Sequence, residues 1–204
     1  MNGNSLNLWQ FCSYAYYKGV KFSIPHQDQY ETVCRELELS EGLKILDAGC
    51  GAGLLEEKIF TKNIPHLKIE ALDFSEKMIH YAKKRIGKML NVNYVTASLD
   101  EKLPYDDNFF DRVVTINVLF AVSNPFLVLK EFHRVLKNSG KIVIVDPKPD
   151  ANMGKTVVAH FKAVNERMKG WKKVKSYFFF INKIAFRFDS PFSESYYGSL
   201  GQKR

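Results

Sequence analysis

An acid and three glycines stand close together in this sequence, and they are the residues best suited to hold a ligand. Asp47 is followed at every second position by Gly49, Gly51 and Gly53. Glycine has no Cβ atom, so such a segment lets the backbone approach a bound nucleoside closely. The glycines come directly after a short apolar run at residues 45–46, and apolar residues then resume at helical spacing. This order predicts a buried strand, a glycine turn at its carboxyl end and a helix.

A second acid, Asp73, lies about 20 residues after the last glycine, a separation typical of ribose-binding acids. A lone acid at a strand end is more often a helix cap or a solvated group, but its conjunction with the glycine turn favours a nucleoside site. A dinucleotide fingerprint has the spacing G-x-G-x-x-G, whose helix N-terminus takes a pyrophosphate. The spacing here differs from that fingerprint, and therefore disfavours a dinucleotide as the ligand.

These residues need a sheet to position them, and several short apolar runs predict its strands. A β-branched run at residues 111–118 is typical of a buried parallel strand. Asp28, Ser75 and Asn124, the last followed by Pro125, are predicted helix N-caps. Strands alternating with helices predict an α/β fold, a Rossmann-like, doubly wound and mostly parallel sheet with helices on both faces. The predicted strands are residues 44–47, Lys68–Asp73, 94–96, 111–118 and 141–145.

Composition narrows the class of protein. The chain has 204 residues, of which 46% are hydrophobic and 25% charged, as in an ordinary globular protein of one domain. No apolar run reaches the roughly 20 residues of a membrane span, and the N-terminus lacks the order of a signal peptide. Three widely separated cysteines favour a reducing compartment and argue against a disulfide framework or a zinc site. We therefore expect a cytoplasmic protein without a bound metal.

The net charge of +8 is carried by the end of the chain. Residues 151–204 hold 11 Lys and Arg against 3 Asp and Glu. This basic, aromatic segment predicts either a solvated face or a surface for an anionic substrate, lipid headgroup or nucleic acid. Apolar spacing predicts a helix from Met153 to about Lys169, and residues 171–187 combine lysines with aromatic side chains that could instead pack in the core.

The segment 43–147 resembles the class I S-adenosylmethionine-dependent methyltransferases. Within them it is most similar to the small-molecule branch with a ubiquinone-biosynthesis-type methyltransferase domain. The resemblance implies a cofactor-binding core at residues 43–149, an N-terminal helical cap at 1–42 and a C-terminal segment at 150–204, all in one domain. The matching phrases, in order, are residues 45–53, 71–75 with Met78 and Ala82, 103–105 ahead of 110–111, 117–119 and 131–137.

The resemblance also implies a role for individual residues in holding S-adenosylmethionine. Asp47 and the backbone of residues 49–53, including Cys50, would hold the methionine part. Asp73 would bind the ribose and Phe74 would lie against the adenine. Ser98 and Leu99 would meet the adenine amine, and Asn117 and Val118 would line the side of the methyl donor.

Three departures from the family pattern bear on the site. Ser98 replaces the usual acid at the adenine, where the backbone of Leu99 could substitute. Phe120 stands where a histidine is frequent, so it is either a wall of the substrate pocket or part of the core. The family's Leu-Lys-Pro-Gly-Gly turn reads as residues 136–140, Leu-Lys-Asn-Ser-Gly. The family has two further strands after the position of residue 150, and the sequence motif that usually precedes them is absent here. Residues 177–188 would supply one or both of these strands, or the chain is a shortened form of the domain.

The acceptor of the methyl group is not readable from the sequence. No histidine is an obvious base, and the catalytic residues stay unassigned. Tyr14, Tyr17 and His26 are placed near the mouth of the substrate site by their aromatic N-terminal segment. We expect methyl transfer to a small-molecule or lipid-like acceptor. The alternatives are a non-catalytic, cofactor-binding regulatory protein and an RNA methyltransferase, the latter disfavoured because Asn117 does not begin an Asn-Pro-Pro-Tyr phrase.

Overall fold

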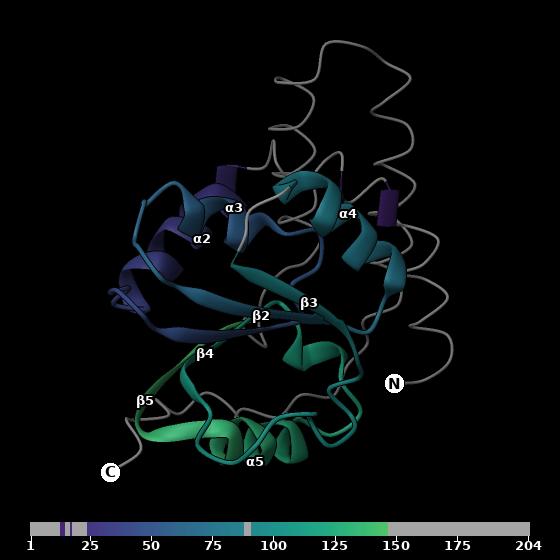
Figure 1. Cartoon of the computed structure of the whole chain (residues 1–204). Helices are drawn as coiled ribbons and strands as arrows, with labels where there is room; N and C mark the ends of the chain where they lie inside the picture. The colour runs from purple at the N-terminus through teal and green to yellow at the C-terminus, as the bar shows by residue number, and fades with distance from the viewer. Residues whose placement is uncertain (1–12, 15–16, 18–23, 88–90, 147–204) are drawn as a thin grey trace.

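A computed structural model describes residues 13–14, 17, 24–87 and 91–146, and the structural statements below concern these residues. Their five strands form one sheet in the order β3-β2-β1-β4-β5 (Figure 1). All four neighbouring pairs are parallel. This sheet confirms the predicted doubly wound α/β fold. The strands are β1 (Lys44–Ala48), β2 (Lys68–Asp73), β3 (Val92–Thr96), β4 (Phe110–Ile116) and β5 (Leu136–Val145).

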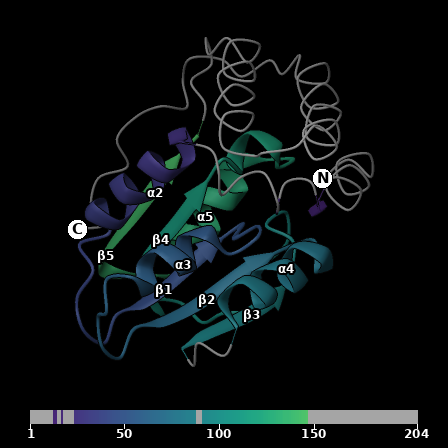
Figure 2. The same cartoon turned by 90° about the horizontal axis from the view of Figure 1, so that it is seen from above.

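Helices cover both faces of the sheet. Figures 1 and 2 show α2, α3 and α4 on one face and α5 on the other. A short 3-10 helix, η2 (Leu119–Ala121), follows β4 and precedes α5. This arrangement places every strand's carboxyl end at one edge, where a doubly wound sheet binds its ligand. The helices are α2 (Ile24–Glu36), α3 (Leu54–Phe60), α4 (Glu76–Ile86) and α5 (Pro125–Val135).

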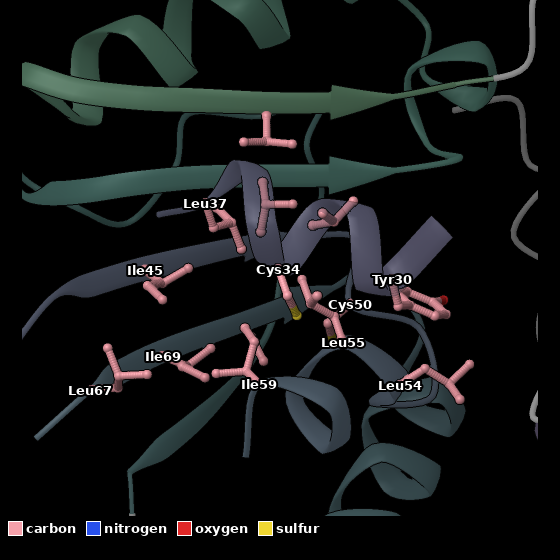
Figure 3. Packing of buried hydrophobic residues seen from close by; sticks show 14 of the residues in the cluster. Tyr30, Cys34, Leu37, Ile45, Cys50, Leu54, Leu55, Ile59, Leu67 and Ile69 are labelled. Atoms are coloured by element: carbon pink, nitrogen blue, oxygen red, sulfur yellow. The ribbon is translucent and has the colours of Figure 1, made fainter. Parts of the chain in front are cut away.

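The two cores follow from the alternation of side chains along the strands. On β1, Ile45 packs with α2 and α3 while its neighbour Leu46 packs with α5, since successive strand side chains point to opposite faces. Figure 3 shows Cys34 of α2 and Leu37, which directly follows α2, near Ile45 and Ile69 in the same core cluster. Burying one such aliphatic side chain stabilises the fold by about 1.5–3 kcal/mol. β1 is therefore packed against helices on both of its faces.

Two predicted caps are confirmed and one is wrong. Ser75 Oγ accepts a hydrogen bond from the Met78 N–H at 3.4 Å, and Asn124 caps α5, with Pro125 at its first position. Asp28, by contrast, lies inside α2, which begins at Ile24. Pro at the second position fits that earlier start, because the first helical turn needs no N–H from proline.

The boundaries of β4 and β5 differ from the prediction. β4 ends at Ile116 because Asn117 has φ of +58°, outside the strand region. β5 begins at Leu136, where we expected a turn, and pairs Leu136 with Phe110. The register then shifts, so that Lys141 pairs with Arg112 and the intervening residues form an irregular start to the strand. Both Leu136 and Phe110 are buried in the same core cluster, and that burial explains the early pairing.

The predicted helix from Met153, the aromatic run at 177–188 and most of the N-terminal segment lie outside the described residues. Among the residues that are described, none of the helices has the length and apolar character required to cross a membrane.

Candidate functional site

The glycine turn is fastened to the end of β2. The N–H groups of Gly49 and Cys50 donate to the Leu72 carbonyl at 2.7 and 2.9 Å. Gly49 has φ of +88°, and a Cβ atom there would lie 2.4 Å from Val118 Cγ2. Gly53 also has positive φ and lies against Ala82 of α4. The backbone of the turn therefore leaves no room for side chains at these positions.

Asp73 holds the same turn from the side. Its Oδ2 accepts the Gly51 N–H at 2.9 Å, and its Oδ1 accepts the Ser75 N–H at 2.8 Å. Burial raises the pKa of this carboxyl to about 6, opposed by the two N–H donors. Each carboxylate oxygen has a second lone pair, so both can still accept from a ribose hydroxyl. The contact of Asp73 with a ribose stays a prediction. The structure adds that Asp73 holds the glycine turn and the start of α4 in place through these two hydrogen bonds.

A buried acid pair lies behind the turn. Asp47 is 3% exposed and Glu56, from the first turn of α3, is 1% exposed. Among the described residues, neither Glu56 carboxyl oxygen has a hydrogen-bond donor. Burial raises the pKa of both carboxyls; the neighbouring Glu56 raises that of Asp47 further, whereas Asp47 lowers that of Glu56. A proton held between the two carboxyls supplies a donor to the pair. Sequence reasoning missed Glu56, because a glutamate in a short helix reads as a solvated residue.

Cys50 contributes through its backbone. Its side chain is buried beside Asp47 and Glu56, and burial raises the pKa of its thiol well above the usual range. The thiol is therefore protonated and uncharged, and the N–H of Cys50 is the group that fastens the turn to β2.

The predicted methyl-donor side lies across from the glycine turn. The Asn117 N–H donates to the Val145 carbonyl at 2.6 Å, and its side-chain amide donates to Gln29 of α2 at 3.3 Å. Val118 packs closely against Gly49, since a Cβ atom added to this glycine would lie 2.4 Å from Val118 Cγ2. Phe120 is half-buried in η2, directly after this pair. The structure thus brings the residues that follow β4 against the turn that follows β1.

Asp146, immediately after β5, joins this edge. Its Oδ2 accepts the Leu119 N–H at 3.2 Å, whereas its buried Oδ1 has no hydrogen-bond partner among residues 13–14, 17, 24–87 and 91–146. Burial raises the pKa of Asp146 to about 7, opposed by the N–H groups of Leu119 and Val118. The predicted last strand ends at residue 145, and no role is predicted for Asp146 from the sequence. A signal was present, since Asp47 and Asp73 also lie at or next to the ends of their strands.

The predicted adenine side lies next to Asp73. The Ala97 N–H donates to the Asp73 carbonyl at 3.1 Å, so the loop after β3 begins beside the acid. Ser98 Oγ accepts the Asp100 N–H at 3.1 Å, and the Leu99 side chain is buried in the core. Phe74 is half-buried. Any contact of Leu99 with a ligand must therefore come from its backbone, in keeping with the predicted substitution.

The three predicted N-terminal residues are not all placed. Tyr17 stacks on Tyr81 of α4 with ring centroids 4.7 Å apart, and Tyr14 lies at 6.1 Å from the same ring. Arg85 lies over Tyr17 and donates to the Ala52 carbonyl at 2.7 Å, which links this segment to the glycine turn. His26 is in the first turn of α2, and its side chain lies outside the described residues. Contact of these residues with a substrate stays a prediction.

The relatives found by sequence comparison are methyltransferases. Residues 46–144 match the family described as methyltransferase domain. A demethylmenaquinone methyltransferase from Staphylococcus aureus is 32% identical over 121 residues, which are 59% of this chain and 50% of that protein. The chain thus spans about half the length of the curated relatives it matches.

Solved structures show the same fold. A SAM-dependent methyltransferase from Aquifex aeolicus is 26% identical with a TM-score of 0.53, over 66% of this chain and 78% of that chain. An S-adenosylmethionine-dependent methyltransferase from Mesorhizobium loti is also 26% identical, with a TM-score of 0.51 over 60% of this chain and 52% of that chain. The [4+2]-cyclase SpnF, at 16% identity and a TM-score of 0.59, covers 78% of this chain and 76% of that chain and shares the fold alone.

Proposed function

Since the chain carries a class I S-adenosylmethionine-dependent methyltransferase domain, we propose that it transfers a methyl group from this cofactor to a small-molecule or lipid-like acceptor. The relatives from Staphylococcus aureus are demethylmenaquinone methyltransferases, which favours an acceptor of that kind. The fold alone hosts more than one chemistry, so the site has to carry the proposal.

The observation that carries the proposal is the clamped glycine turn. Leu72 and Asp73 of β2 hold the backbone of Gly49, Cys50 and Gly51 in a shape in which a Cβ atom at Gly49 would collide with Val118. Asp73 keeps lone pairs for ribose hydroxyls at the same place. A nucleoside with a small polar extension fits this donor and acceptor set, and S-adenosylmethionine is such a molecule.

The charge of the site also suits this cofactor. When bound, S-adenosylmethionine supplies an activated methyl group on a positively charged sulfur. Asp73, Asp47 and Glu56 form an acidic region under the turn that retains negative charge even with one proton shared by the pair. Residual negative charge in a poorly hydrated site attracts a cation more strongly than it would in water. Asn117 and Val118 then line the side from which an acceptor would approach, and positioning there can lower the barrier by several kcal/mol.

We further propose the finer assignments that accompany this activity. The chain acts in the cytoplasm as one domain, with residues 43–149 binding the cofactor. The basic segment 150–204 meets the acceptor or an anionic surface, and nucleic acid is a disfavoured partner. Ser98 and Leu99 bind the adenine amine, Phe74 covers the ring, and Tyr14, Tyr17, His26 and Phe120 belong to the acceptor side.

Calorimetry with S-adenosylhomocysteine tests the cofactor site. We expect the wild-type chain to bind it and Asp73→Ala to weaken binding at least tenfold, because both the ribose contact and the clamp on Gly51 are lost. Asp106→Ala, an exposed acid in the loop before β4, is the matched control and should bind normally. Absence of binding by the wild-type chain would contradict the proposed function.

Methyl transfer to demethylmenaquinone, followed with a labelled methyl group, then separates the alternatives. Product formation supports the enzyme. Tight S-adenosylhomocysteine binding without transfer to this acceptor or to any component of a cell extract would favour the non-catalytic regulatory protein. Transfer to RNA, with binding that weakens steeply as salt rises, would favour the RNA methyltransferase.

A further inference from the structure

Asp146 is an acid to which the proposed cofactor site assigns no role. It lies directly after β5, at the edge of the sheet where all five strands have their carboxyl ends. Its backbone neighbour Val145 accepts the Asn117 N–H at 2.6 Å, which fixes the end of β5 to the end of β4. Asp146 therefore lies beside the residues predicted to face the methyl donor.

The two oxygens of its carboxyl group are in different situations. Oδ2 accepts the Leu119 N–H at 3.2 Å, and this bond fixes the orientation of the group. Oδ1 is buried and has no hydrogen-bond partner within the part of the chain that the structure describes. A buried acceptor without a donor costs about 1–3 kcal/mol relative to a satisfied one. Folded proteins seldom retain such a group, and a ligand bound beside it could supply the missing donor.

A continuous set of contacts connects this oxygen to the glycine turn. Asp146 holds Leu119, Leu119 follows Val118, and Val118 packs on Gly49. The acid is thus connected to the cofactor turn through Leu119 and Val118. An acceptor bound against this segment would lie near both the turn and Asp146.

Resting on the proposed methyltransferase function, we propose that Asp146 is the catalytic base, with Oδ1 taking the proton from the nucleophilic group of the acceptor. The acceptor's O–H, N–H, S–H or C–H bond gives its proton to the carboxylate. The electron pair left on the acceptor forms the new bond to the methyl carbon, and the pair of the broken carbon–sulfur bond stays on sulfur. Charge balances, because a carboxylate and a sulfonium become a carboxylic acid and a neutral thioether.

The surroundings of Asp146 suit a base near neutral pH. The polar groups that interact with it are the N–H groups of Leu119 and Val118. The shift in its pKa to about 7 comes from burial, opposed by those N–H groups, and no charged group of the described residues contributes to it. A base with a pKa close to the working pH combines the required unprotonated form with a strong proton affinity.

The test begins with the ligand-free chain. Carbon-13 NMR of the carboxyl groups, with the Asp146 signal assigned by its loss in Asp146→Asn, should give a titration midpoint near pH 7 for this residue. A midpoint near pH 4, the ordinary value for aspartate, would overturn the proposal. This readout needs neither cofactor nor acceptor.

Turnover with demethylmenaquinone gives the second readout. Asp146→Asn should lower kcat by a factor of about 100 or more while binding S-adenosylhomocysteine as the wild-type chain does. Asp146→Glu, which keeps a carboxylate, should recover part of the activity, and the wild-type kcat should fall below about pH 7. Asp106→Asn is the matched control and should change neither quantity.

Two results separate this inference from the function it rests on. Full turnover in Asp146→Asn, with normal S-adenosylhomocysteine binding, would overturn the role of Asp146 and leave the methyltransferase intact. Failure of the wild-type chain to bind S-adenosylhomocysteine would instead contradict the proposed function. If Asp146→Asn does not fold, the titration of the wild-type carboxyl group and the wild-type pH profile decide the question.

Discussion

The glycine turn after β1 and the loop after β4 lie at the same edge of the sheet, but their polar groups are paired differently. Around the turn, Asp73 uses both carboxyl oxygens and Leu72 its carbonyl to satisfy the N–H groups of the backbone. Beside the loop, one buried oxygen of Asp146 has no partner among the described residues. The backbone N–H groups of Gly49, Cys50 and Gly51 in the first region are paired before any ligand arrives, as suits the binding of a cofactor. The second lacks a donor, as suits a group that reacts with an acceptor.

The contact between the two regions is the place where a single change should have the largest effect. Gly49→Ala adds a Cβ atom 2.4 Å from Val118 Cγ2, at a residue with φ of +88°. Backbone strain and overpacking together should lower the free energy of unfolding by about 2–4 kcal/mol, measured by urea denaturation. Binding of S-adenosylhomocysteine should be lost at the same time, since the turn has to move.

Gly42→Ala is the matched control for that variant. Gly42 has φ of +76°, but its added Cβ would have no neighbour within 4 Å, so only backbone strain of about 1–2 kcal/mol is expected. Shortening Val118 as well, in Gly49→Ala with Val118→Ala, should recover part of the lost stability. Equal losses in Gly42→Ala and Gly49→Ala would show that the contact between the regions has no energetic role.

Glu56 tests whether the turn region is as fully satisfied as its hydrogen bonds suggest. Burial raises the pKa of the Glu56 carboxyl from 4.5 to about 7. Between these two pH values the carboxyl is therefore protonated in the folded chain and ionised in the unfolded chain. Stability from this group is fully present below about pH 4.5 and is lost as the pH rises through about 7. Glu56→Gln supplies a permanent donor to Asp47, and should flatten this pH dependence by on the order of 1–3 kcal/mol.

Urea unfolding at pH 5 and pH 8 measures the Glu56 effect. Glu57→Gln changes the neighbouring glutamate, which is half exposed, and should leave the pH dependence as it is in the wild-type chain. An unchanged slope in Glu56→Gln would mean that Glu56 is ionised in the folded protein and that no proton is shared behind the turn.

The smallest expected effects concern two helix caps, one near the glycine turn and one near the loop after β4. Ser75→Ala removes the cap of α4 beside Asp73, and Asn124→Ala removes the cap of α5 near the loop after β4. Each should cost about 0.5–2 kcal/mol of stability by thermal or urea unfolding. Only Ser75→Ala should also weaken S-adenosylhomocysteine binding, because loss of the cap loosens the start of α4, where the backbone N–H of residue 75 donates to the clamping acid. Weakened binding in Asn124→Ala would mean that the two regions are not separate.

The sequence by itself determined those features that arise from local interactions. The glycine turn follows from residues that tolerate positive φ, and the Ser75 and Asn124 caps follow from side chains that satisfy N–H groups two or three positions onward. The five strands follow from short runs of apolar residues. Because each of these signals lies within a few residues, no knowledge of the distant chain was needed to predict them.

Other features were decided only by tertiary structure. β5 begins early because Leu136 finds Phe110 across the sheet, although the local residues favour a turn. α2 begins ahead of Asp28, the residue that local pattern selects as its cap. Glu56 and Asp146 become chemically distinctive only because packing removes water from them and places them near Asp47 and Leu119. Burial and long-range pairing depend on the whole fold, so the pattern around each of these residues could not reveal them.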